Sequence, residues 1–189
     1  MKIRNLVITS VVCALVLAVS GCGAKNNAMA EIAQDFGGTL QDKLGASADD
    51  IHSEDASEFH NANAYEGTYY ICTDSDMPTL ESRVYNDADE AREYFEEIYD
   101  IFTQAFGDGF DGDCQYALND NSGYIVVDGS LSGSNIFGDR YMSGEELYAG
   151  LYYYDNAVIV IAPRNDAGNS EVEDVISRLG LPMANGENT

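Results

Sequence analysis

The stretch "LYAGLYYYDNAVIVIAP", residues 147–163, decides how the rest of the chain is interpreted. Aromatic and apolar residues fill both of its arms, and Asp155-Asn156 between them is typical of a two-residue turn. The second arm, residues 157–161, is apolar on both faces, as in a central strand that is covered on both sides. The stretch therefore predicts a hairpin in the middle of a sheet. The expected cross-strand pairs are Tyr154 with Ala157, Tyr152 with Ile159, and Gly150 with Ile161.

The sequence around this hairpin predicts an α+β fold. Segments rich in β-branched and aromatic residues predict further strands at 67–73, 81–85, 114–120 and 122–131. Apolar residues at helical spacing predict helices at 87–106 and 170–179, capped by Asp87 and Ser170. Residues 131–146 are rich in Gly and Ser and predict a loop. We expect a mainly antiparallel sheet of four to six strands with two packed helices.

The segment before this domain has a different composition. Residues 23–62 are rich in Ala, Asn, Asp, Ser and Gly, with apolar residues at helical spacing only between 28 and 44. Gly37-Gly38 interrupts that pattern, so the segment is expected to be irregular or partly helical. The expected organisation is a signal peptide at 1–21, a tether and partly helical segment at 22–62, one α+β domain at 63–183, and a flexible tail at 184–189.

The first 22 residues carry an export signal. Lys2 and Arg4 precede an apolar run from Leu6 to Val19, which is shorter than the roughly 20 residues that span a bilayer. The run ends in Val19-Ser20-Gly21-Cys22, which resembles the lipobox of bacterial lipoproteins. The resemblance implies cleavage before Cys22 and lipid, such as palmitate, on that residue. It implies a protein anchored in the cell membrane and facing outside the cytoplasm, in either a Gram-positive or a Gram-negative envelope.

Charge and cysteine content narrow the possible partners. The chain has a net charge of −24, and loss of Lys2 and Arg4 with the signal peptide would change it to −26. Such a surface repels phosphate, so no nucleic-acid partner is expected. Of the four cysteines, Cys13 would leave with the signal peptide and Cys22 would carry lipid, so Cys72 and Cys114 would remain as thiols. Export permits oxidation, so they are a candidate disulfide, with free thiols as the open alternative.

Motifs for catalysis or cofactor binding are weak. "GDGFDG" at 107–112 matches a dinucleotide-binding pattern but follows a helix and contains acidic residues, so it is rejected. Asp108, Asp111 and Asp113 are a weak metal candidate whose spacing does not fit a calcium loop, and a solvated turn is preferred. His52 and His60 lie in the polar segment. No cofactor and no metal are expected, and an enzyme is less expected than a binding protein.

One face of the predicted hairpin carries Tyr148, Tyr152 and Tyr154. Tyrosine combines an apolar ring with a polar tip, which suits a protein or glycan contact, although it equally suits a core. The helices at 87–106 and 170–179 can cover one face of the hairpin, which we expect to be the Leu151 side. The tyrosine side is then expected to be covered by the 28–44 segment, by a second copy or by a ligand. We expect part of this face to be exposed as a binding surface. The resulting hypothesis is a non-catalytic, lipid-anchored binding module of the cell envelope. The alternatives are a small extracytoplasmic hydrolase that uses carboxylates and a structural subunit of an envelope complex.

Overall fold

The computed structural model describes residues 22–56, 66–105, 110–131, 134–137, 140–143, 146–164 and 168–186. These residues form an α+β fold around an antiparallel sheet of seven strands, more than the four to six expected. The order across the sheet is β1-β2-β3-β9-β8-β5-β4. Its strands are β1 (Ile51–Asp55), β2 (Gly67–Cys72), β3 (Thr79–Tyr85), β4 (Phe110–Leu118), β5 (Ser122–Leu131), β8 (Glu146–Tyr154) and β9 (Ala157–Ala162).

The predicted hairpin, which is formed by β8 and β9, lies in the middle of this sheet. β8 and β9 pair with Tyr154 opposite Ala157 and Tyr152 opposite Ile159, so the expected register is confirmed. Asp155 in the turn has a positive φ of 52°, a conformation that Asp adopts more readily than most residues. Every residue of β9 is buried, because the sheet is covered on both faces.

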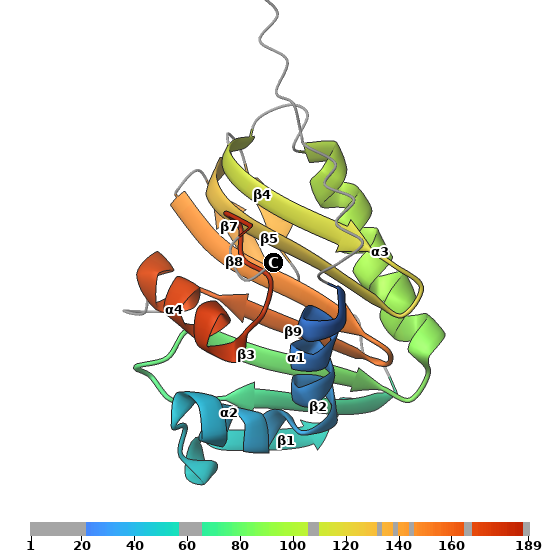
Figure 1. Cartoon of the computed structure of the whole chain (residues 1–189), viewed down its shortest axis with the longest axis vertical. Helices are drawn as coiled ribbons and strands as arrows, with labels where there is room; N and C mark the ends of the chain where they lie inside the picture. The colour runs from blue at the N-terminus through green and yellow to red at the C-terminus, as the bar shows by residue number, and fades with distance from the viewer. Residues whose placement is uncertain are drawn as a thin grey trace, which may run out of the picture.

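The helices form a layer on each side of the sheet (Figure 1). α3 (Ala88–Ala105) covers one face, where Phe95 and Leu151 share a core. α1 (Cys22–Gln34), α2 (Phe36–Leu44) and α4 (Asn169–Leu179) cover the other face, where Ile32, Leu40 and Ile176 pack together. The expectation that the 170–179 helix joins α3 on the Leu151 side is therefore wrong. Both faces of the hairpin are apolar, so its own pattern could not decide which face α4 covers.

The N-terminal segment belongs to the domain from α1 onward and does not hang from it as a tether. Ile32 and Leu40 are 1% and 0% exposed, and both pack against the sheet. The helical segment is split at Asp35, whose carboxylate accepts a hydrogen bond from the Gly38 backbone N–H at 2.9 Å. A Cβ on Gly38 would lie 2.2 Å from that carboxylate. Gly38, the second glycine of the pair that interrupts the sequence pattern, therefore permits the cap that starts α2.

Four further details differ from the sequence analysis or refine it. Part of the expected loop at 131–146 forms a second sheet of two strands, β6 (Ser134–Phe137) and β7 (Arg140–Ser143). The N-cap of α4 is Gly168, with no side-chain cap, so Ser170 is not the cap. Asp87 does accept a hydrogen bond from the Asp89 backbone N–H at 2.8 Å, at the start of α3. β1 escapes prediction because its exposed side chains carry no apolar alternation.

Buried tyrosines make the fold sensitive to alkaline pH. Burial raises the pKa of Tyr85, Tyr94 and Tyr152 above the ordinary value of about 10. The folded state then holds these protons more tightly than the unfolded chain does. We expect stability to be unaffected by these groups below about pH 10 and to fall as the pH rises above it. Tyrosinate absorbance and circular dichroism, recorded together, should show late ionisation coupled to unfolding. Complete titration near pH 10 with an intact fold would contradict this.

Candidate functional site

The predicted tyrosine surface is largely covered by the chain itself. Tyr148 and Tyr152 are 4% and 0% exposed, and Tyr154 is half-buried against the same core. The Tyr152 hydroxyl donates to the Pro182 carbonyl at 2.9 Å, and the Tyr148 hydroxyl accepts from the Ala184 backbone N–H at 3.3 Å. The expected open contact surface is therefore not present at Tyr148 and Tyr152, because α1, α2, α4 and residues 181–184 occupy that face.

The candidate disulfide between Cys72 and Cys114 does not form. Cys72 lies on β2 and Cys114 on β4, with β3, β9, β8 and β5 between them. Five strand spacings of about 4.8 Å separate the two strands by roughly 24 Å, far beyond the 7 Å limit between bridged Cα atoms. The two side chains also belong to the cores on opposite faces of the sheet. Burial raises the pKa of the Cys72 thiol, which lowers its reactivity.

The weak metal candidate gains no support. Asp108 lies outside the described residues, while Asp111 and Asp113 are exposed on β4. Asp113 is directly opposite Asp128 of β5, a pairing of like charges. Among the residues that the structure describes, no group of three or more His, Cys, Asp or Glu side chains could hold a metal ion.

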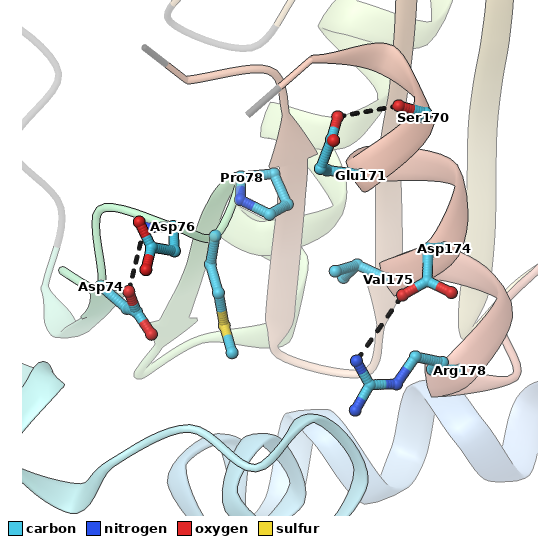
Figure 2. A pocket seen from close by; sticks show the side chains of 9 residues that line it. Asp74, Asp76, Pro78, Ser170, Glu171, Asp174, Val175 and Arg178 are labelled. Carbon is cyan, nitrogen blue, oxygen red and sulfur yellow. Dashed lines mark hydrogen bonds and ion pairs between the residues drawn. The ribbon is translucent and has the colours of Figure 1, made fainter. Parts of the chain in front are cut away.

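A groove of about 410 Å³ lies between the β2–β3 turn and α4 (Figure 2). Met77, Pro78 and Val175 form its apolar part. Its polar part is mainly acidic, with Asp74 and Asp76 from the turn and Glu171 and Asp174 from α4. Among the described residues that line it, Arg178 is the one basic side chain. Residues nearly a hundred positions apart in the sequence therefore share one surface, which the linear pattern of either segment could not reveal.

The hydrogen bonds of this groove hold its carboxylates in place. The Asp76 backbone N–H donates to the Asp74 carboxylate at 2.9 Å, which fixes the turn. The Ser170 hydroxyl donates to the Glu171 carboxylate at 2.9 Å and is the main reason that the pKa of Glu171 is lowered. Arg178 lies 3.6 Å from the Asp174 carboxylate and also donates to the Lys43 carbonyl at 2.9 Å.

This geometry suits binding better than acid–base catalysis. A carboxylate with a lowered pKa is a weak general base at neutral pH, so Glu171 is a poor activator for Ser170. The excess of negative charge attracts cationic groups and repels phosphate. His52, on β1, is exposed and does not line the groove, and His60 lies outside the described residues.

A second group of polar residues is buried beneath α3 on β3. Glu81 and Arg83 are 8% and 4% exposed and lie on the same face of the strand, two residues apart. The Arg83 guanidinium lies 5.0 Å from the centre of the Tyr94 ring, within the range of a cation–π contact. We interpret this group as structural, because Glu81, Arg83 and the Tyr94 ring pack together beneath α3.

Within the described ranges, no helix combines the length and the apolar character needed to cross a bilayer.

Comparison with known proteins identifies no relative. No protein-family model matches the chain, and neither the curated proteins nor the solved structures that were searched give a match.

Proposed function

We propose that this chain is a lipid-anchored, non-catalytic binding module of the bacterial cell envelope that faces outside the cytoplasm. The observation that carries the proposal is the Val19-Ser20-Gly21-Cys22 sequence at the end of a short apolar run with a basic start. Lipid on Cys22 would supply two acyl chains, and two chains give a stable anchor where one is marginal. The ligand we propose is a protein or a glycan.

The organisation of the fold supports this proposal. α1 packs into the core through Ile32, so a chain that starts at Cys22 would keep the helical cover of the sheet. The acidic groove offers hydrogen-bond acceptors around an apolar floor, an arrangement that suits binding. The hydrolase alternative would need a carboxylate with a raised pKa or an activated nucleophile, and the groove offers neither in Glu171 and Ser170.

Replacement of Cys22 tests the anchor. In a bacterial host fed labelled palmitate, Cys22→Ala is expected to abolish incorporation of label and to leave the signal peptide uncleaved. Cys13→Ala is the matched control, because Cys13 lies within the apolar run and precedes the cleavage position. This control should be labelled and processed like the unaltered chain. Incorporation of palmitate by Cys22→Ala would contradict the proposal.

The non-catalytic part of the proposal needs a separate assay. The lipidated chain is expected to retain a glycan or protein ligand on an array without turning over ester, peptide or glycoside substrates. The hydrolase alternative instead predicts turnover that Glu171→Gln removes. Turnover that this substitution abolishes would therefore replace the binding module with an enzyme.

A further inference from the structure

We infer that lipid on Cys22 holds this domain directly at the membrane surface, with α1 as a short rigid connection. The inference rests on the proposed lipid anchor and adds the position of the domain to it. It follows from the position of Ala28, Met29 and Ile32 in the core. The sequence alone predicts instead a tether and partly helical segment of some forty residues at 22–62.

The connection between anchor and core is only a few residues long. Cys22 lies on α1, and the side chains of Ala28 and Met29, six and seven residues further along the helix, are buried at 7% and 2% exposed. Six residues of helix rise by about 9 Å, so the anchored residue lies within about two turns of the core. A flexible tether of forty residues would instead have a mean end-to-end distance of roughly 35 Å, so the domain could move that far from the anchored residue.

The connection is also held firmly at its inner end. Ile32 is 1% exposed in the core, and Glu31 forms an ion pair with Lys43 of α2 at 2.6 Å. The Lys43 ammonium also donates to the Leu179 carbonyl at the end of α4, at 3.3 Å. These contacts tie α1 to α2 and α4, so the helix cannot swing without disturbing the layer that covers the sheet.

The β2–β3 turn lies away from the anchored end of the domain. In Figure 1 this turn is at the left edge of the molecule, whereas the Cys22 end of α1 is near its centre, on the sheet face that α4 also covers. A membrane held at Cys22 therefore lies closer to the start of α1 than to this turn.

Energy transfer from a single tryptophan tests this arrangement, because the natural chain contains no Trp. Asn27 is exposed near the start of α1, and Ser75 is exposed in the β2–β3 turn. Asn27→Trp and Ser75→Trp are each made in the full chain, lipidated in a bacterial host and placed in phosphatidylcholine vesicles containing a dansyl-labelled lipid headgroup. We expect transfer from position 27 to exceed transfer from position 75 severalfold.

A spacer provides the matched control. Twenty Gly/Ser residues inserted between Gly23 and Ala24 would add a mean reach of roughly 25 Å, which should lower transfer from position 27 severalfold. Equal transfer from positions 27 and 75, or equal transfer with and without the spacer, would overturn the inference. Mass spectrometry of the N-terminal peptide is performed first. An absence of lipid on Cys22 contradicts the proposed function, whereas lipid with equal transfer contradicts only the position of the domain.

Discussion

Ile32→Ala should destabilise the domain by about 2–5 kcal/mol, because it removes buried methyl groups and leaves a cavity. Ile32 is 1% exposed on α1 and packs into the core that α1, α2 and α4 share with the sheet. For a domain of this size the melting temperature should fall by roughly 5–15 °C. Urea unfolding of residues 22–189, followed by circular dichroism, measures the change in the free energy of unfolding.

The control for this substitution lies on the same helix. Gln34 is exposed near the end of α1, so Gln34→Ala should change stability by no more than about 0.5 kcal/mol. If residues 22–62 were a tether, Ile32→Ala would be equally small. Equal effects of the two substitutions would therefore remove α1 from the core, and they would weaken the inference that it fixes the domain at the membrane.

The central elements could be predicted because their patterns are local. The turn at Asp155-Asn156 sets the pairing of β8 and β9, and alternation then assigns each tyrosine to a face. The apolar spacing of α3 and the Asp87 cap likewise belong to one continuous stretch. These features need no information about distant parts of the chain.

The arrangement of the layers could not be predicted in the same way. Val172, Val175, Ile176 and Leu179 give α4 an apolar side that would fit either face of the hairpin. The side it covers depends on the N-terminal helices, whose pattern Gly37-Gly38 obscures. Once α1, α2 and α4 share one face, Tyr148 and Tyr152 become core residues. The predicted binding surface was therefore wrong because the 28–44 segment, one of the three covers left open by the sequence, packs on the tyrosine face.

The groove was missed for a related reason. Asp74 and Asp76 look like part of a chain reversal, and Glu171 and Asp174 look like the solvated side of a helix. Only the order of strands in the sheet brings the β2–β3 turn beside α4. The same order separates Cys72 from Cys114, so one fact about topology both creates the groove and excludes the disulfide.

Tyr152→Ala is expected to have the other large effect, a loss of about 3–5 kcal/mol as for other large aromatic core residues. The ring is fully buried and lies against Gly150, where an added Cβ would come within 2.5 Å of it. The substitution should empty this space and also remove the hydrogen bond from the Tyr152 hydroxyl to the Pro182 carbonyl. Thermal unfolding by circular dichroism measures the loss.

Tyr152→Phe separates packing from hydrogen bonding at this position. It keeps the ring but leaves the Pro182 carbonyl without its donor, which should cost about 1–3 kcal/mol. A surface tyrosine that serves a partner would behave differently, because both substitutions would leave the fold stable and weaken only binding. Unchanged stability in Tyr152→Ala would therefore restore the exposed tyrosine face that the hairpin sequence suggests. The expected order of stability is unaltered chain, then Tyr152→Phe, then Tyr152→Ala, because the ring contributes most through the space it fills between the sheet and its helical cover.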